Sequence, residues 1–351
     1  GVFFGFIMVP NDAMAKIKGF INKGINISCV ITLADVQAVA LRNLINIPVI
    51  ALEDFRNVDI KEVFIPRSST DLAFMPYFER YGIKSVVPRY GNYQENHFLN
   101  VMEHLPELFS VYEMLGDAES KKTFCAAIKG DVTGKINDYR YAPETQYFLD
   151  GFYPNAGDIA IDGGAYDGST AISFEKCGAK VYAFEMDAVN YKNCAARLKN
   201  SSIILENLGL SDKESTENYF SGGTSSRKDS NGNLTANFID LDTYIAQKNI
   251  PRVDYIKLDI EGAELDMLHG AAKTIKRFKP KMAVSAYHRP EDLWTLANYI
   301  KSLRPDYQIE FRHYKIDAKD YMLDDNERAI AKYFGLDYLV PTPCEYLFYC
   351  R

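Results

Sequence analysis

The sequence predicts an α/β protein, and three observations support this prediction. From Asp158 onward, short apolar runs alternate with segments of helical spacing, as in βαβ units. The first apolar run, Ile159–Asp162, leads into a glycine-rich loop that a helical segment follows. A shorter alternation of the same kind covers residues 1–90. We therefore expect a main parallel sheet that is preceded by a small N-terminal α/β unit.

Composition narrows the class of protein. Of the 351 residues, 47% are hydrophobic and 25% are charged, which is ordinary for a globular chain of more than one domain. The formal net charge of −7 argues against a nucleic-acid partner. No apolar run approaches the ~20 residues of a membrane span. The six cysteines are scattered and form no C-x-x-C pair, which indicates a reducing compartment. We expect a cytoplasmic protein.

Residues 1–90 are predicted to form a small Rossmann-like domain. Its apolar and helical stretches are Val2–Val9, Ala13–Lys23, Ser28–Leu33, Val49–Leu52, Glu62–Pro66, Asp71–Tyr81 and Ser85–Pro88. The segment after the first stretch reads Val-Pro-Asn-Asp-Ala where a dinucleotide-binding domain has G-x-G-x-x-G. Without those glycines the backbone cannot approach a pyrophosphate. A structural or interaction role is favoured over dinucleotide binding.

Residues 91–139 are predicted to be a helical linker between this domain and the remaining chain, residues 140–351. Asn96–Leu115 and Lys121–Lys129 carry apolar residues at helical spacing. Pro106 should end or kink the first of these helices, because proline cannot donate the helical hydrogen bond. Further along, Ser221–Asn233 is rich in glycine, serine and asparagine and is expected to be a surface loop.

The glycine-rich loop and a later acid together predict a nucleoside site. The loop Gly163–Thr170 follows the first strand, and the next strand, Lys180–Phe184, ends at Glu185. Glycines let the backbone pass close to a ligand, and a carboxylate on the next strand accepts hydrogen bonds from ribose hydroxyls. Asp162 and Glu185 are 23 residues apart, near the ~20 expected for this pairing.

The order of residues in the loop favours one nucleoside over another. A diphosphate ligand favours G-x-G-x-x-G, whereas residues 162–168 read D-G-G-A-Y-D-G. An acid directly before the loop would repel a pyrophosphate but suits the ammonium group of a methionine moiety. The loop therefore favours S-adenosylmethionine (SAM) over NAD as the cofactor.

Several dispersed motifs make the comparison with a known family specific. They are IDGGAYDGSTA (161–171), YAFEMD (182–187), GLSD (209–212), IDLDTYI (239–245), YIKLDIEGAE (255–264) and SAYHRPEDLW (285–294). The motifs and their order along the chain resemble those of the FkbM family of SAM-dependent methyltransferases. The resemblance covers roughly residues 140–314 and a closing strand.

The resemblance implies a seven-stranded Rossmann-like sheet of the class I methyltransferase type, whose last strands form an antiparallel pair. Tyr307–Tyr314 and Glu345–Cys350 have the apolar character that such a pair needs. The connection 315–344 between them is long and includes a helical pattern at Asn326–Tyr333. We interpret it as an insertion beside the rim of the active site, because long structured loops are often functional.

The resemblance also implies the residues that would contact SAM. Glu185 would bind the ribose, Asn207 and Leu208 would frame the adenine, and Asp259 would lie near the sulfonium methyl. Gln146 and Tyr147 would close over the cofactor. The methionine part would contact the loop residues Asp162, Gly163, Gly164, Ala165, Asp167 and Gly168.

Two histidines and one acid are candidates for catalysis. Methyl transfer requires the acceptor to be aligned and its proton removed, and an imidazole of near-neutral pKa suits the second task. His288 follows a predicted strand, Met282–Ala286, and His313 ends the next one. Both should lie on the same rim of the sheet as Asp259. The favoured interpretation uses no metal; an ion held by Asp259 and His288 is the alternative.

The leading hypothesis is an O-methyltransferase that acts on a hydroxyl of a sugar, polysaccharide or secondary metabolite. O-methylation is implied by the resemblance, whereas the residues themselves indicate the SAM site. The first alternative is a non-catalytic or nucleotide-sugar-binding module in surface-glycan assembly, in which residues 1–90 dominate. An NAD-dependent enzyme is the third hypothesis.

Overall fold

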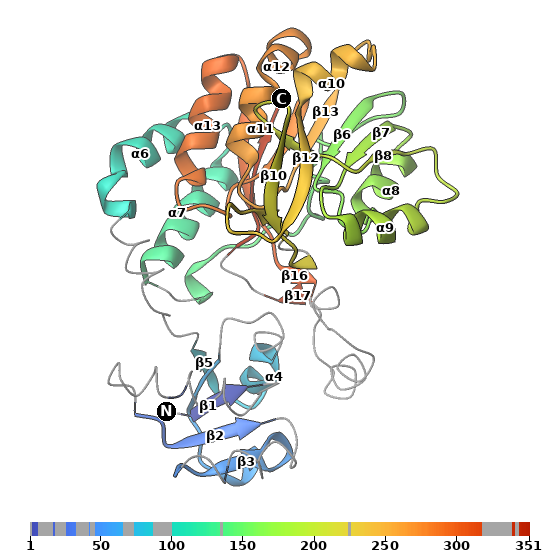
Figure 1. Cartoon of the computed structure of the whole chain (residues 1–351). Helices are drawn as coiled ribbons and strands as arrows, with labels where there is room; N and C mark the ends of the chain where they lie inside the picture. The colour runs from blue at the N-terminus through green and yellow to red at the C-terminus, as the bar shows by residue number, and fades with distance from the viewer. Residues whose placement is uncertain are drawn as a thin grey trace. The chain divides into compact units, whose positions relative to one another are not determined.

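The computed structural model describes residues 2–5, 17, 26–32, 42, 46–65, 74–86, 100–133, 136–223, 226–317, 339–340 and 344–351 (Figure 1). The chain divides into two compact units. The first consists of Gly1–Phe98, Ala126–Tyr141 and Lys315–Pro343, and the second of Leu99–Cys125, Ala142–Tyr314 and Cys344–Arg351.

The first unit contains a five-stranded parallel sheet with the strand order β3-β2-β1-β4-β5. Strand β2 is buried along its whole length, as expected for a parallel strand covered on both faces. The strands are β1 (Val2–Gly5), β2 (Cys29–Thr32), β3 (Val49–Ala51), β4 (Glu62–Phe64) and β5 (Lys84–Val86). The other described elements of this unit are η1 (Leu52–Asn57), α4 (Met75–Glu79), η2 (Ile136–Asp138) and a separate antiparallel pair, β16 (Ile316–Asp317) and β17 (Leu339–Val340).

The second unit is built on a seven-stranded sheet with the order β15-β18-β14-β13-β6-β7-β8. All neighbouring pairs are parallel except those of β18, which runs antiparallel to both β14 and β15. This arrangement confirms the predicted seven-stranded sheet and its antiparallel closing strand. The strands are β6 (Ile159–Gly163), β7 (Lys180–Phe184), β8 (Ile204–Glu206), β13 (Tyr255–Leu258), β14 (Lys281–Ser285), β15 (Ile309–His313) and β18 (Tyr346–Cys350).

Helices pack beside this sheet and begin where the sequence supplies a cap or a turn. Gly168, with a φ of 82°, makes the turn into α8, and the Asp187 side chain accepts hydrogen bonds from the first amides of α9. The helices are α6 (Leu105–Met114), α7 (Ala118–Thr133), α8 (Ser169–Lys176), α9 (Ala188–Arg197), α10 (Leu241–Gln247), α11 (Glu264–Gly270), α12 (Ala272–Phe278) and α13 (Asp292–Leu303).

A second, four-stranded sheet with the order β11-β10-β12-β9 was not predicted. It consists of β9 (Gly209–Ser211), β10 (Ser215–Phe220), β11 (Arg227–Lys228) and β12 (Leu234–Asp240). Strand β10 has only one buried residue, so hydropathy gives it no strand signal. The predicted loop Ser221–Asn233 is therefore partly wrong, because β11 pairs with β10 inside it.

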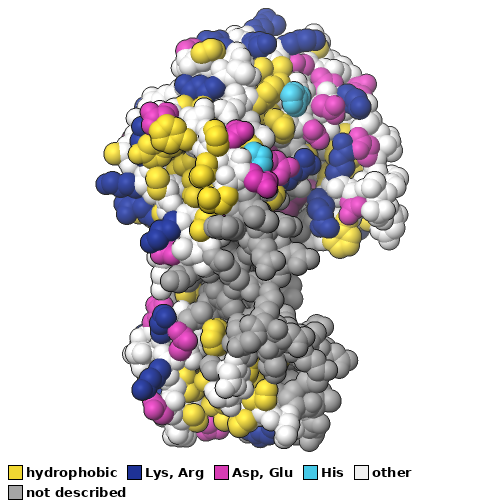
Figure 2. Space-filling model, turned by 90° about the vertical axis from the view of Figure 1, so that its left-hand side faces the viewer, with side chains coloured by type: hydrophobic (Ala, Val, Ile, Leu, Met, Phe, Trp, Pro, Cys, Tyr) yellow, Lys and Arg dark blue, Asp and Glu magenta, His cyan; other side chains and the backbone are white. Residues whose placement is uncertain are grey.

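Around α6, proline acts as expected and apolar side chains remain exposed. Pro106 lies in the first turn of α6, after a break at His104. Leu105 and Phe109 of this helix and the preceding Met102 are among the most exposed large apolar residues. Figure 2 shows hydrophobic side chains gathered on the face that carries α6. No helix of the described part of the chain is long and apolar enough to cross a membrane.

Some sequence predictions lie outside the described residues. They include the Val-Pro-Asn-Asp-Ala segment at 9–13, most of Ala13–Lys23, and the helical pattern at Asn326–Tyr333.

Candidate functional site

The candidate site lies at the carboxyl ends of β6, β7, β13 and β14, which are neighbours in the sheet. The amides of Gly164 and Ala165 donate to the Phe184 carbonyl at 3.1 and 2.9 Å, which ties the glycine-rich loop to the end of β7. Gly164 has a φ of 77°, and a Cβ at this position would collide with the carbonyl oxygen of Asp259. Glycine is therefore required where the loop passes over the end of β13.

Glu185 directly follows β7 and lies against the loop. Its Oε2 accepts a hydrogen bond from the amide of Tyr166 at 2.8 Å, and its Oε1 accepts one from the amide of Asp187 at 2.8 Å. Burial raises the pKa of Glu185, although these hydrogen bonds favour the charged form. The two backbone amides leave further lone pairs on both oxygens, so the carboxylate can still accept hydrogen bonds from a diol.

The residues predicted to frame the adenine and the loop have structural partners. The Asn207 side chain donates to the carbonyl of Glu185 at 2.8 Å, which fixes the turn after β7. Leu208, next to it, is half-buried. Asp167 accepts a hydrogen bond from the amide of Ser169 at 2.9 Å and forms an ion pair with Arg197. Asp167 thus stabilises the start of α8, in addition to any contact with a ligand.

Asp162 is fully buried and faces a lysine that the sequence analysis did not single out. The ammonium of Lys257 lies 3.1 Å from Asp162 Oδ1 and donates to the carbonyls of Gly163 and Gly164 at 3.0 and 2.7 Å. Burial lowers the pKa of Lys257, but the carboxylates of Asp162 and Asp259 raise it above its ordinary value overall. Lys257 therefore stays charged and holds the glycine-rich loop on β13. Asp162 acts on the loop through this ion pair.

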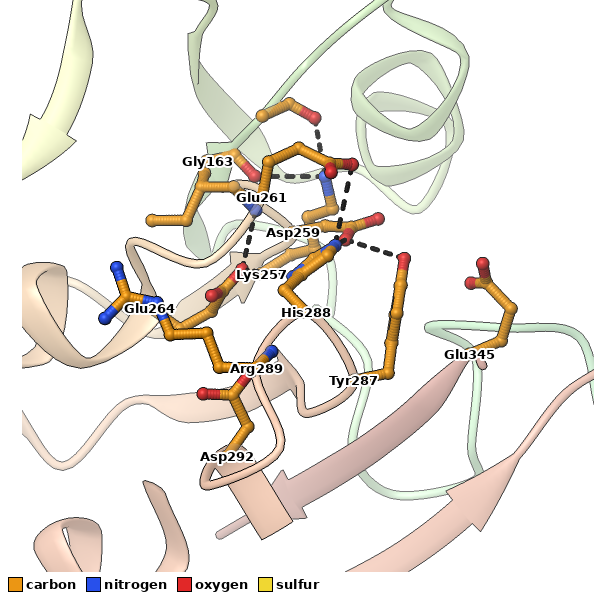
Figure 3. Close-up of polar contacts among 12 residues, drawn as sticks. Gly163, Lys257, Asp259, Glu261, Glu264, Tyr287, His288, Arg289, Asp292 and Glu345 are labelled. Carbon is orange, nitrogen blue, oxygen red and sulfur yellow. Dashed lines mark hydrogen bonds and ion pairs between the residues drawn. The ribbon is translucent and has the colours of Figure 1, made fainter. Parts of the chain in front are cut away.

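Asp259 is the centre of a hydrogen-bonded cluster (Figure 3). Its Oδ2 accepts from the Tyr147 hydroxyl at 2.7 Å, and its Oδ1 accepts from the Tyr287 hydroxyl at 3.0 Å. Burial raises the pKa of Asp259, but Lys257, His288 and the hydroxyl donors lower it below its ordinary value overall. The carboxylate is therefore ionised and held in one orientation.

His288 is surrounded by carboxylates. Its Nδ1 is 2.9 Å from Glu264 Oε1, and its Nε2 is 3.4 Å from Asp259 Oδ1 and 3.5 Å from Glu261 Oε1. Burial lowers the pKa of His288, but these three acids raise it well above the ordinary value. While Nε2 has no ligand, this arrangement favours the charged form of the imidazole. The expectation of a near-neutral histidine base is thus corrected by the three acids.

Glu345 closes the cluster on the side of β18. Its Oε2 accepts a hydrogen bond from the Gln146 side chain at 2.8 Å, which links the predicted SAM-closing segment to the end of the insertion. Burial and the charge of Asp259 raise the pKa of Glu345 to about 7. A carboxyl group that changes charge near neutral pH therefore lies beside the ionised Asp259.

The backbone around the cluster is strained. Among the described residues, six non-glycine residues have a positive φ, and four of them belong to this region: Tyr147, Tyr166, Glu261 and Glu345. Each such conformation costs of order 1–3 kcal/mol and persists only where the surroundings enforce it. Strain of this kind concentrates at functional sites.

His313 is placed differently from the prediction. Its side chain is fully buried, its Nε2 lies 2.7 Å from the Cys344 carbonyl oxygen, and its ring packs edge-on against Tyr346. A soluble acceptor cannot reach the imidazole in this conformation. The reason is that β15 lies at the edge of the sheet, separated from β14 by β18.

Four members of the site escaped the sequence analysis as individual candidates: Lys257, Glu264, Tyr287 and Glu345. A signal existed for Lys257, because a lysine within the buried strand β13 must find a charged partner. Tyr287 lies inside the motif that drew attention to His288. Glu345 follows the long insertion, and its proximity to Asp259 depends on tertiary structure alone.

Two comparisons with known proteins bear on the fold and the family. The sequence model of the methyltransferase FkbM domain family matches residues 162–316. The crystal structure of a methyltransferase FkbM from Methylobacillus flagellatus KT superposes with a TM-score of 0.64 and 21% identity, covering 100% of this chain and 89% of that one. This likeness shows the shared fold.

More distant solved structures cover 56% of this chain. They include a putative rRNA-methylase from Clostridium thermocellum (TM-score 0.33, 9% identity, 86% of that chain) and Aeropyrum pernix fibrillarin with natively bound S-adenosyl-L-methionine (0.31, 11%, 67%). No curated protein matches the chain. The segment 162–316, which holds the glycine-rich loop, Glu185, Asp259 and His288, is thus similar to the FkbM methyltransferase domain.

Proposed function

We propose that the protein transfers the methyl group of SAM to a hydroxyl oxygen of a small molecule or glycan, such as a sugar, a polysaccharide or a secondary metabolite. The proposal rests on one observation: two groups of residues lie together at the carboxyl end of the sheet. One is the glycine-rich loop with its hydrogen bond to Glu185, and the other is the cluster of Asp259 and His288. The first suits a nucleoside cofactor, and the second suits a polar acceptor.

Each part has a task in the proposed reaction. Glu185 binds the ribose, Asn207 and Leu208 border the adenine, and the loop 163–168 lies under the methionine part. His288 orients the acceptor hydroxyl, and the ionised Asp259 accepts its proton as the methyl arrives. Alignment of the two reactants supplies most of the rate, because displacement at a sulfonium needs little covalent help from the protein.

The proposed division of the chain assigns the chemistry to residues 140–351. The strands β1 to β5 of the first unit lie within residues 1–90, which serve a structural or interaction role, and residues 91–139 link this part to residues 140–351. A nucleotide-sugar-binding module without catalysis is the competing function. Calorimetric titration with SAM and with NAD, followed by a screen for labelled methyl transfer to glycans and hydroxylated metabolites, separates the two. SAM binding without transfer to any acceptor would favour the competing function.

Replacing Glu185 by alanine is expected to weaken SAM binding by about 10–150-fold. The change removes charged hydrogen bonds to the ribose, worth about 1.5–3 kcal/mol. Calorimetric titration of the folded variant measures the effect.

Two further variants control for side effects of this change. Glu185→Gln keeps an oxygen acceptor for the backbone amides and tests whether the charge itself matters. Glu175→Ala removes a half-buried carboxylate of α8 whose partner is Ser202, outside the candidate site, and it should leave SAM affinity unchanged. If Glu185→Ala bound SAM as tightly as Glu175→Ala, the ribose would lie elsewhere.

A further inference from the structure

The Nε2 atom of His288 is directed at two acids without forming a hydrogen bond to either. It lies 3.4 Å from Asp259 Oδ1 and 3.5 Å from Glu261 Oε1, whereas charged N–H···O bonds measure about 2.7–2.9 Å. The side chain of His288 is only 7% exposed, and Nε2 has no hydrogen-bond partner in the described part of the chain. Figure 3 shows the imidazole pointing between these carboxylates. Buried polar atoms in proteins nearly always have a hydrogen-bond partner, so the unpartnered Nε2 between two carboxylates indicates a position for a ligand.

The spacing suits two ligands of one metal ion. Imidazole nitrogen and carboxylate oxygen bind metals at about 2.0–2.2 Å, so neighbouring ligands of a tetrahedral ion lie about 3.4 Å apart. Asp259 and His288 have this separation. Asp259, Glu264 and His288 also form a group whose ligand atoms all lie within 4.8 Å of one another.

Glu264 provides an independent observation. Its Oε1 lies 2.9 Å from His288 Nδ1 and accepts from the amide of Ile260 at 2.9 Å, and its side chain is fully buried. Metal-binding histidines usually donate their second ring N–H to a carboxylate, which fixes the tautomer and turns the free lone pair toward the ion. Glu264 holds the ring of His288 in this way, and an ion bound at Nε2 would replace the proton that this nitrogen carries in the charged imidazole.

We propose that Asp259 and His288 bind a divalent transition-metal ion, with Glu264 as the positioning residue. The imidazole ligand favours Zn²⁺, Fe²⁺ or Ni²⁺, and the carboxylate ligand also suits Mn²⁺, whereas Mg²⁺ and Ca²⁺ prefer all-oxygen sites. Two protein ligands leave coordination positions for water or an acceptor oxygen. An ion there would lower the pKa of a bound hydroxyl, a role that rests on the proposed function.

The test measures ion binding directly, without SAM or an acceptor. Purified full-length protein, freed of metal with EDTA and dialysed, is titrated with Mn²⁺, and electron paramagnetic resonance reports the free ion. One Mn²⁺ is expected per chain. His288→Gln and Asp259→Asn, which preserve shape, should each weaken binding by more than the about 10–100-fold expected for Glu264→Gln.

His269→Ala is the matched control, because His269 is an exposed histidine of α11 outside the cluster. It should bind Mn²⁺ as the unaltered protein does. The proposal fails if folded protein leaves the Mn²⁺ signal unchanged at millimolar concentration, or if His288→Gln binds as tightly as His269→Ala. Mn²⁺ binding without methyl transfer would keep the metal site and count against the proposed function alone.

Discussion

Replacing His288 by alanine is expected to lower the rate of methyl transfer by about 10²–10⁴-fold while SAM affinity stays nearly unchanged. The side chain contacts Asp259, Glu261 and Glu264, on the side of the site formed by β13 and β14. The proposed SAM contacts come from the loops after β6 and β7. Loss of the imidazole therefore removes a group beside the proposed acceptor and leaves the proposed SAM contacts in place.

The measurement combines turnover with calorimetric SAM binding on the same preparation. Because alanine leaves the buried Glu264 without its histidine partner, His288→Gln accompanies it as a variant that retains a hydrogen-bond donor. Both variants should lose turnover, and only the alanine variant should lose much stability. If SAM affinity fell and the rate did not, His288 would be a cofactor contact instead.

The sequence predicted the parts of the fold whose signal is local. Strands β6, β7 and β13 are short buried runs, and each is followed by a glycine or an acid that marks its end. The alternation of these strands with helices predicted a parallel sheet, because the rules for βαβ connections allow few other topologies. The four-stranded sheet with β10 was missed, since its residues alternate between exposed and half-buried and carry little hydrophobic signal.

The chemistry of the site was harder to predict than its position. His288 and Asp259 were expected at one rim, and the structure brings them together. The charge of His288 was not predicted, because it depends on Glu261 and Glu264 folding back around the ring. Residue type and spacing indicate which groups gather, whereas their charge depends on distances of a few ångströms that only the tertiary structure sets.

Lys257 stabilises the fold and also positions the glycine-rich loop of the proposed SAM site. Its side chain is 3% exposed, and its ammonium forms an ion pair with the fully buried Asp162 and donates to the carbonyls of Gly163 and Gly164. Removing one partner of a buried ion pair leaves an uncompensated charge, which costs more than the net contribution of the intact pair. The loop would also lose the donor that fixes its carbonyls.

Replacing Lys257 by methionine is therefore expected to lower the free energy of unfolding by about 3–5 kcal/mol and to weaken SAM binding. Denaturant unfolding measures the first effect, and calorimetry measures the second. Lys248→Met is the matched control, because Lys248 pairs with Glu206 at 2.9 Å but is half exposed. Such a surface pair contributes about 0–1 kcal/mol.

A second substitution identifies the source of the loss. In the double variant Lys257→Met with Asp162→Asn, the buried carboxylate becomes a neutral amide of the same shape, so part of the lost stability should return. SAM affinity should stay low, since the amide cannot replace the lysine donor to Gly163 and Gly164. If Lys257→Met lowered the free energy of unfolding by no more than Lys248→Met does, the ion pair between Lys257 and Asp162 would not stabilise the glycine-rich loop. If the double variant instead recovered SAM affinity, the loss in Lys257→Met would come from the unpaired charge of Asp162 and not from the missing lysine donor.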